Sequence, residues 1–206
     1  MDIEKGIEDY VFGIREVFGK VPVNTIKEII KALLKAYEEG KKVITMGNGG
    51  HASTASHLIN DLAKHTIVSD KKDEVIVKGK RFKTLCLDDN VATLTSWAND
   101  VGYEDCFSEQ LTNWVEEGDV VIGITGSGNS QNILNAFQVA KRHRAITIAL
   151  TGYQGGKIKD VADISFIVPS NNISFIEDVH FSLTHLWCGI IRRILQRKQA
   201  SKGAKE

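Results

Sequence analysis

Three hydroxyl side chains lie close together in one glycine-rich stretch, residues 125–130 (TGSGNS). The stretch follows an apolar run, residues 120–124, and precedes a helical pattern that begins near Gln131. A strand, a small-residue turn and a helix in this order direct backbone N–H groups and a helix dipole towards an anion. The spacing is not that of a nucleotide P-loop. The stretch therefore predicts a phosphomonoester site, and the alternative is an ordinary turn in which Ser130 caps the helix.

A second group of reactive side chains follows another glycine-rich turn, residues 47–50 (GNGG). His57 and Asp61 are four residues apart, so they share one face of the helix predicted after this turn. A histidine and a carboxylate placed in this way suit metal ligation or acid–base chemistry. The alternative is a solvated pair on an outer face. His65, one turn further on, is a weaker candidate and could simply end the helix.

The third group lies on an apolar helical segment near the C-terminus and comprises Glu177, His180 and His185. Such groups need partners, because burying them unpaired costs several kcal/mol. Glu177 and His185 are about 12 Å apart along a helix axis. They can therefore share a ligand only if both side chains reach towards the middle of the helix. For His180, a bond to a backbone carbonyl in the core or at an interface is the favoured interpretation.

The elements that must position these groups alternate between strands and helices. Five apolar runs predict strands at residues 43–46, 84–87, 120–124, 146–150 and 164–168. Helical patterns between them lie at residues 52–64, 91–98, 105–117, 131–143 and 156–162. Uniformly apolar runs are typical of parallel strands that are covered on both faces. We therefore expect an α/β fold with a doubly wound, five-stranded parallel sheet flanked by helices.

The whole chain of 206 residues is expected to form one domain. Residues 1–40 predict two helices, whose apolar stripes would pack on the chain's own sheet or on a partner subunit. Residues 41–196 comprise the α/β core and a long C-terminal helix from about residue 173, and residues 197–206 form a solvated tail. Residues 68–81 are polar and predict a loop or a short hairpin.

The two glycine-rich turns point to one shared site. Ligands of open parallel sheets bind beyond the carboxyl ends of the strands, where the strand order reverses. Each turn follows a predicted strand and opens a helix. Either turn alone is a weak signal, but two such turns in one sheet indicate a common site.

The composition excludes several classes of protein. The 26 basic residues are balanced by 26 acidic ones, so we expect no nucleic-acid partner and no membrane partner. No apolar run approaches the ~20 residues that span a bilayer, and the N-terminus lacks the apolar region of a secretory signal. Three scattered cysteines indicate buried, reduced thiols. We therefore expect a soluble, cytoplasmic protein.

Taken in order, these motifs resemble those of the sedoheptulose 7-phosphate isomerases (phosphoheptose isomerases), a family of the sugar isomerase (SIS) domain class. The resemblance runs from roughly residue 5 to residue 195. The matching stretches are residues 47–50 with His57, 99–102 with Phe107-Ser108, 118–130, 150–157, Ala162-Asp163, and the pair His180 and His185.

The resemblance implies a homotetramer with active sites at subunit contacts and a phosphorylated sugar as substrate. It places the catalytic acid and base on Asp61 and His185. It also implies that a divalent metal, usually zinc, is held by His57, Asp61, Glu177 and His185. The residues expected to contact the substrate are Asn48, Gly49, Gly50, His51, Asp89, Asn90, Thr125, Gly126, Ser127, Ser130 and Glu177.

Five positions depart from the residues that are usual in this family. The family has Glu at Asp61, Gln at Glu177, Ser at His51, Arg at His65 and Asp at Ser174. These positions surround the sugar rather than the main phosphate loop. The sequence therefore supports phosphosugar binding more strongly than it supports a particular sugar.

Glu177 bears directly on the metal. It places a second carboxylate beside Asp61, and the two would repel each other unless a cation lay between them. Two histidines and two carboxylates are also a sound ligand set for zinc. The alternative is that Glu177 pairs with His180, with His185, or with a basic residue of another subunit.

The predicted reaction is aldose–ketose isomerisation of sedoheptulose 7-phosphate through an enediol. The phosphate would be held by the loop at 125–130, with C1 and C2 of the sugar between Asp61 and His185. A bound metal could polarise the carbonyl, but a coordinated Asp61 or His185 could not act as a free base. The alternatives are an isomerase of another sugar phosphate, a non-catalytic phosphosugar-binding or replication-initiator-binding SIS module, and a structural tetramer. Two histidines and two carboxylates favour catalysis.

Overall fold

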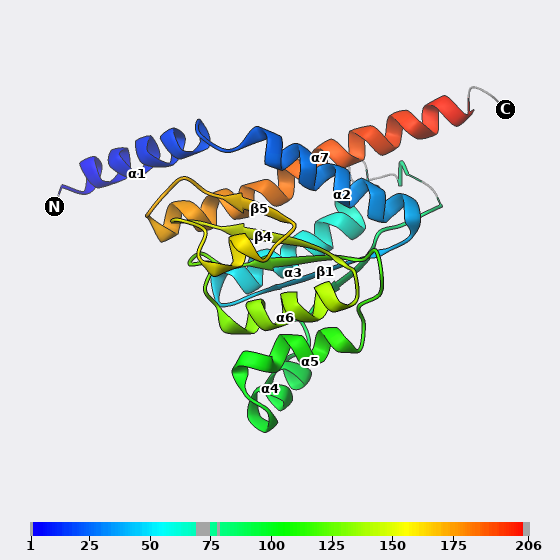
Figure 1. The fold of residues 1–206 in the computed structure, drawn as a ribbon. Helices are drawn as coiled ribbons and strands as arrows, with labels where there is room; N and C mark the ends of the chain where they lie inside the picture. Colours follow the sequence, from blue (N-terminus) through cyan, green and yellow to red (C-terminus); the bar gives the residue numbers. More distant parts are fainter. Residues whose placement is uncertain (1, 69–74, 78, 204–206) are drawn as a thin grey trace.

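A five-stranded, fully parallel sheet forms the centre of the protein (Figure 1). The computed structural model describes residues 2–68, 75–77 and 79–203. The strands, in the order in which they lie across the sheet, are β2 (Lys83–Cys86), β1 (Lys42–Gly47), β3 (Val120–Ile124), β4 (Ile146–Thr151) and β5 (Ile164–Ile167). The prediction of a doubly wound parallel sheet is confirmed.

The strand order reverses between β1 and β3. The chain leaves β1 to form β2 on one side, and it then returns to form β3 on the other side. Gly47, at the end of β1, is in register with Ile124, at the end of β3. Both glycine-rich turns therefore leave the sheet from neighbouring strand ends, at the position where open parallel sheets bind ligands.

Helices cover both faces of the sheet. On one face lie α2 (Val23–Glu39), α3 (Gly50–Asn60) and α7 (Ile173–Gly203). On the other face lie α4 (Val91–Asp100), α5 (Cys106–Thr112) and α6 (Gln131–Arg142). Neighbouring strand residues point to opposite faces, so Val43 packs with the first set and Ile44 with the second. This alternation divides the core into two apolar layers.

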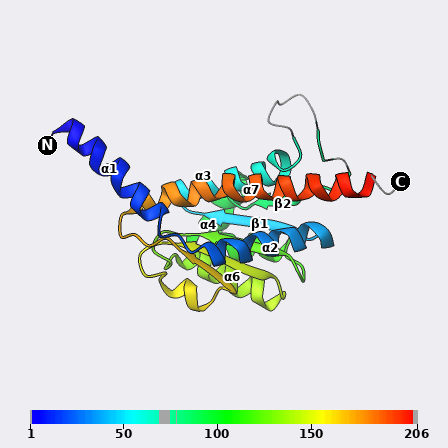
Figure 2. The same cartoon turned by 90° about the horizontal axis from the view of Figure 1, so that it is seen from above.

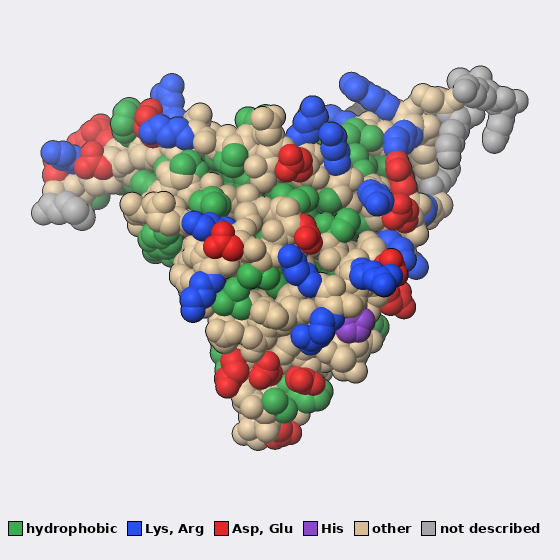
Figure 3. Space-filling view, viewed as in Figure 1, with side chains coloured by type: hydrophobic (Ala, Val, Ile, Leu, Met, Phe, Trp, Pro, Cys, Tyr) green, Lys and Arg blue, Asp and Glu red, His purple; other side chains and the backbone are tan. Residues whose placement is uncertain are grey.

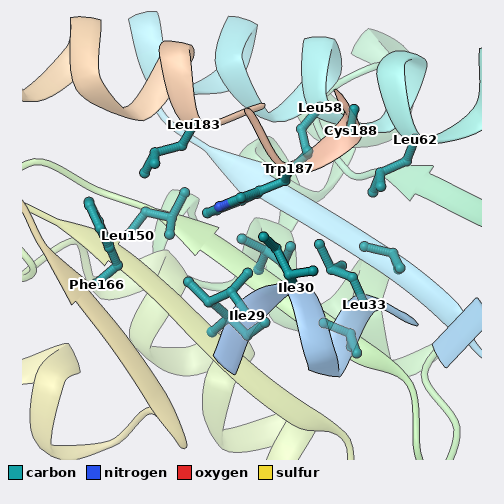
Figure 4. Packing of buried hydrophobic residues seen from close by; sticks show 14 of the residues in the cluster. Ile29, Ile30, Leu33, Leu58, Leu62, Leu150, Phe166, Leu183, Trp187 and Cys188 are labelled. Carbon is teal, nitrogen blue, oxygen red and sulfur yellow. The ribbon is translucent and has the colours of Figure 1, made fainter. Parts of the chain in front are cut away.

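The indole of Trp187 lies at the centre of the first layer (Figure 4). It comes from α7 and points towards Ile29 of α2 and Leu150 of β4, and all three side chains are fully buried. Burying an aromatic or branched side chain contributes roughly 1.5–3 kcal/mol. Trp187 thus fixes α7 across the sheet, and with it the histidines that α7 carries.

Helix α1 (Ile3–Phe18) leaves the body of the protein at one end (Figure 2). Its apolar side chains are largely exposed: Ile7 is 60% exposed and Phe12 is 65% exposed, and Val17 is its one buried residue. The ring of Tyr10 packs edge-on against Phe175 at 5.0 Å. The apolar stripe of α2, by contrast, is buried in the chain's own core. Of the two N-terminal stripes, only that of α1 lacks a covering surface among the described residues.

Several predicted boundaries differ from the structure. Helix α7 continues to Gly203, through much of the predicted solvated tail, because residues 197–200 (RKQA) are good helix formers. The helix expected at 105–117 is only α5, preceded by a 3₁₀ turn at Tyr103–Asp105. The helix expected at 156–162 is a 3₁₀ turn at Lys157–Asp160.

The helix predicted over residues 52–64 has two parts. Helix α3 ends at Asn60, and residues Asp61–His65 form a π-helical turn. Within the polar segment at 68–81, Val68 forms an antiparallel bridge with Val75, while residues 69–74 and 78 lie outside the described part of the chain.

Basic and acidic side chains are interspersed over the face shown in Figure 3. The three cysteines, Cys86, Cys106 and Cys188, are free thiols and are buried, as predicted. Among the described residues, no helix combines the length and the apolar character needed to cross a membrane.

Candidate active site

Three predicted site residues converge between α3 and α7. The Nε2 atoms of His57 and His185 lie 2.9 Å apart. Asp61 Oδ2 lies 3.3 Å from His57 Nε2 and 3.8 Å from His185 Nε2. Of the residues described, these three form the group that could hold a metal ion.

Local structure explains why these side chains meet. His57 lies in the last turns of α3, and Asp61 begins the π-helical turn that follows. Helix α7 packs along α3 and brings His185 to the same point. The ring of Phe181, one turn before His185, lies 4.6 Å from the ring of His57 and 5.2 Å from that of His185. Phe181 therefore restricts both imidazoles.

The Oδ2 atom of Asp61 is the least satisfied polar atom of this group. It is buried and makes no hydrogen bond, although three imidazoles surround it, the third being His65 at 3.7 Å. A buried carboxylate oxygen without a partner is costly. Ligand atoms around a tetrahedral zinc, with bonds of about 2.0–2.1 Å, lie about 3.4 Å apart. The spacing and chemistry of His57, Asp61 and His185 therefore fit a divalent metal.

Glu177 is not part of this group. Its Oε1 lies 4.0 Å from Nδ1 of His51, and its carboxylate lies over Gly50, at the start of α3. Its carboxylate therefore lies at the start of α3, outside the group formed by His57, Asp61 and His185. Three of the four predicted ligands are thus brought together, and the fourth, Glu177, stays a prediction.

The loop at 125–130 has the expected form, with one difference. Ser130 occupies the N-cap position of α6, but its side chain makes no capping bond. Its hydroxyl lies instead 2.9 Å from that of Thr125. Ser127 Oγ accepts a hydrogen bond from the backbone N–H of Asn129. The hydroxyls therefore face the loop rather than the helix, which argues against the interpretation of an ordinary capped turn.

This loop is held rigidly by its neighbour at 155–158. The backbone N–H of Ile158 donates to the carbonyl of Gly128, and that of Lys157 donates to the side chain of Asn129. Gly128 has φ +69°, and a Cβ there would lie 2.0 Å from the carbonyl oxygen of Gly155. Only glycine fits this contact. The close approach keeps the loop preformed.

In the other glycine-rich turn, residues 47–50, the side chain of Asn48 is hydrogen-bonded within the protein. Asn48 is bonded to Asn132 and accepts a hydrogen bond from the hydroxyl of Tyr103. Backbone atoms of Gly49 and Gly50 lead directly into α3. A ligand could therefore contact Asn48 through its backbone, or through hydrogen-bonding positions of its side-chain amide that these bonds do not use.

The segment after β2 lines a cleft of about 530 Å³. The lining comprises Asp88 and Asp89 of this segment together with His57 and other residues of α3. Asp89 thus shares a cavity with a member of the histidine group. The side chain of Asn90 is engaged as the N-cap of α4, accepting from the backbone N–H of Thr93. Asp89 stays a predicted substrate contact, and the side-chain oxygen of Asn90 already has a partner.

Two residues near the site carried little signal in the sequence. Asp88 accepts a hydrogen bond from the backbone N–H of Gly47, and burial raises its pKa to about 6. The ring of Phe181 contacts both histidines, tilted against His57 and edge-on to His185. An aromatic residue four positions before His185 was visible in the sequence, but the apolar helix around it made it indistinguishable from core.

Comparisons with known proteins agree with this architecture. A family model for the SIS domain matches residues 9–152. The phosphoheptose isomerase of Thermodesulfovibrio yellowstonii is 33% identical over 97% of this chain and 94% of its own length. That of Helicobacter pylori is 34% identical over 84% of this chain and 85% of its own.

Solved structures give the same result. The phosphoheptose isomerase from Francisella tularensis is 31% identical, with a TM-score of 0.83 over 94% of this chain and 100% of that one. The phosphoheptose isomerase from Neisseria gonorrhoeae is 26% identical, with a TM-score of 0.82 over 92% of this chain and 98% of that one. With its parallel sheet, hydroxyl-lined loop and histidine group, this chain belongs to the phosphoheptose isomerase family of SIS-domain proteins.

Proposed function

We propose that this chain is a phosphosugar isomerase that interconverts sedoheptulose 7-phosphate and an aldose heptose 7-phosphate through an enediol. The observation that carries this proposal is the buried Asp61 Oδ2, which lacks a hydrogen bond and faces three imidazoles. A module that only binds a phosphosugar needs the hydroxyl-lined loop but has no use for this group. The relatives of this chain that are named phosphoheptose isomerases support the same assignment.

The phosphate binds at the loop of 125–130. The hydroxyls of Thr125, Ser127 and Ser130, together with the N-terminus of α6, offer donors to its oxygens. Because Gly128 and the 155–158 segment hold the loop rigidly, little ordering is needed on binding. The reacting end of the sugar then lies towards the histidine group.

Asp61 and His185 are the groups proposed to move protons between C1, C2 and their oxygens. Asp61 Oδ2 lies 3.8 Å from His185 Nε2, so both groups are placed to reach the same end of one substrate. A divalent metal such as zinc would be held by His57, Asp61 and His185 and would polarise the substrate carbonyl. A residue that coordinates the ion is not at that moment a free base, so the acid and base roles of Asp61 and His185 stay unassigned.

Turnover is the direct test of this function. Sedoheptulose 7-phosphate incubated with the protein should give an aldose heptose phosphate, followed by ¹³C and ³¹P NMR. Asp61→Asn and His185→Gln should each lower kcat by about 10²–10⁴, the usual contribution of a positioned acid or base. His143→Gln is the matched control, because His143 lies at the far end of α6. Absence of product from the wild-type protein would contradict the proposal.

Phosphate recognition has its own prediction. Ser127→Ala and Ser130→Ala should each weaken binding of inorganic phosphate by about 1–3 kcal/mol, the scale of a hydrogen bond to a charged group. Ser201→Ala, at the exposed end of α7, is the control. Calorimetry that finds equal affinities in all three variants would remove the loop from the site.

The metal can be tested independently of the sugar. Protein purified without chelator should contain about one divalent ion per chain by elemental analysis, and chelation should remove activity until the ion is restored. His57→Ala should lose the ion. Glu177→Gln should keep it, because Glu177 lies outside the ligand group. A metal-free protein that is fully active would refute this part of the proposal.

We also propose that the protein is a homotetramer in which the exposed apolar stripe of α1 lies at a subunit contact. The monomer mass is 22.8 kDa, so light scattering should give about four times this value. Ile7→Asp and Val11→Asp, at exposed positions of α1, should dissociate the assembly. Val91→Asp, equally exposed on α4, should not. A wild-type particle of monomer mass would exclude the tetramer.

A further inference from the structure

A chain of polar groups joins α7 to the start of α3, away from the proposed metal ligands. His180 Nε2 lies 3.1 Å from the carbonyl oxygen of Thr151, at the end of β4. His180 Nδ1 lies 3.1 Å from His51 Nε2. The other ring nitrogen of His51, Nδ1, lies 4.0 Å from Glu177 Oε1. The catalytic scheme above uses none of these contacts.

The carbonyl at one end determines where the hydrogens lie. A carbonyl oxygen only accepts, so His180 Nε2 must carry the hydrogen of this bond. His180 is fully buried, and burial together with the His51 ring lowers its pKa to about 3. Its ring is therefore neutral and Nδ1 is an acceptor. It follows that His51 Nε2 donates to it, and that a neutral His51 carries no hydrogen on Nδ1.

The free nitrogen of His51 and the carboxylate of Glu177 are then two acceptors that face each other with no donor between them. Burial favours this neutral form by lowering the pKa of His51, although the charge of Glu177 acts in the opposite direction. Glu177 and His180 are the titratable groups that face His51 among the described residues. The arrangement therefore has a place for hydrogen-bond donors from a ligand.

The position of this pair indicates which part of a ligand reaches it. The Cε1 atom of His51 would lie 3.3 Å from a Cβ at Gly126, within the phosphate loop. The carboxylate of Glu177 would lie 3.1 Å from a Cβ at Gly50. The two acceptors thus lie where the two glycine-rich turns meet, beside the proposed phosphate loop and outside the group of His57, Asp61 and His185.

We propose that His51 Nδ1 and the Glu177 carboxylate bind hydroxyl groups on the carbons next to the phosphate of the substrate, and that His180 is the positioning residue that keeps Nδ1 free to accept. The proposal rests on the phosphate loop proposed above and deepens it. It makes the site selective for phosphate esters whose neighbouring carbon carries a free hydroxyl. It assigns His180 a role that its burial alone would not suggest.

Two small phosphate esters test the selectivity. Glycerol 3-phosphate has a hydroxyl on the carbon next to its phosphate-bearing carbon, and 3-hydroxypropyl phosphate lacks it. The wild-type protein should bind glycerol 3-phosphate about tenfold more tightly by calorimetry, the effect of one hydrogen bond to a charged or buried acceptor. Equal affinities for the two esters would overturn the proposal.

Variants of Glu177 and His180 then distinguish a positioning role of His180 from a purely structural one. Glu177→Gln should abolish the preference, because its amide can donate to His51 Nδ1 and occupy it. His180→Phe should also abolish the preference, since His51 can then carry its hydrogen on either nitrogen. His180→Gln should retain much of the preference, because one amide can both donate to the Thr151 carbonyl and accept from His51. His143→Gln should leave the preference unchanged, and a preference that persists in His180→Phe would remove the positioning role.

The tautomer can be observed directly. ¹⁵N NMR of the wild-type protein should show His51 and His180 both protonated on Nε2 only, with and without glycerol 3-phosphate. A proton on Nδ1 of His51 would instead mean an ion pair with Glu177 and would overturn the acceptor role. Inorganic phosphate should bind equally well to all these variants. If the wild-type protein did not bind inorganic phosphate, the phosphate-binding role of the 125–130 loop would be refuted. This outcome differs from a loss of hydroxyl selectivity alone, so the two proposals can fail separately.

Discussion

The parallel pairing of β1 with β3 is the constraint on which the site depends. Their register places Gly47 beside Ile124, so the two glycine-rich turns emerge side by side. Each turn leads into a helix, and the N-termini of α3 and α6 are thereby directed to one region. A slip of one residue would turn every side chain of the strand to the other face of the sheet and remove one apolar layer. The apolar strand sequence therefore also secures the geometry of the ligand site.

The second constraint is the seating of α7. Trp187 is buried against the sheet, and on the same helix Glu177, His180 and His185 are presented to three different partners. A helix that shifted or rotated would lose all three contacts together. This explains why a helix so rich in apolar residues carries titratable groups at all. Its packing energy holds polar side chains at positions that their own interactions would not maintain.

Much of this architecture could be predicted from the sequence. Uniformly apolar runs indicated parallel strands, and the small and hydroxyl residues at 125–130 indicated the loop between β3 and α6. The i, i+4 spacing of His57 and Asp61 indicated a shared face, which the structure confirms. The favoured interpretation of His180, as a core histidine bonded to a backbone carbonyl, is also confirmed.

Other features depend on contacts that a linear pattern does not contain. Glu177 lies beside His51 of α3, a contact between two distant helices that spacing along one helix could not reveal. Asp88 became relevant only because its carboxylate reaches the backbone of β1. The continuation of α7 beyond residue 196 was missed because charge suggested a tail, although the same residues are good helix formers.

Two positions that the sequence was expected to fill differently from its family, 51 and 177, lie together in the structure. His51 Nδ1 lies 4.0 Å from Glu177 Oε1. His180, which is 129 residues from His51 in the chain, contacts the other ring nitrogen of His51. With His51 neutral, both side chains present acceptors to the same space, so a change at either position alone would alter what the pair offers to a ligand. His51, Glu177 and His180 therefore form one contact unit beside the 125–130 loop, and His57, Asp61 and His185 form another.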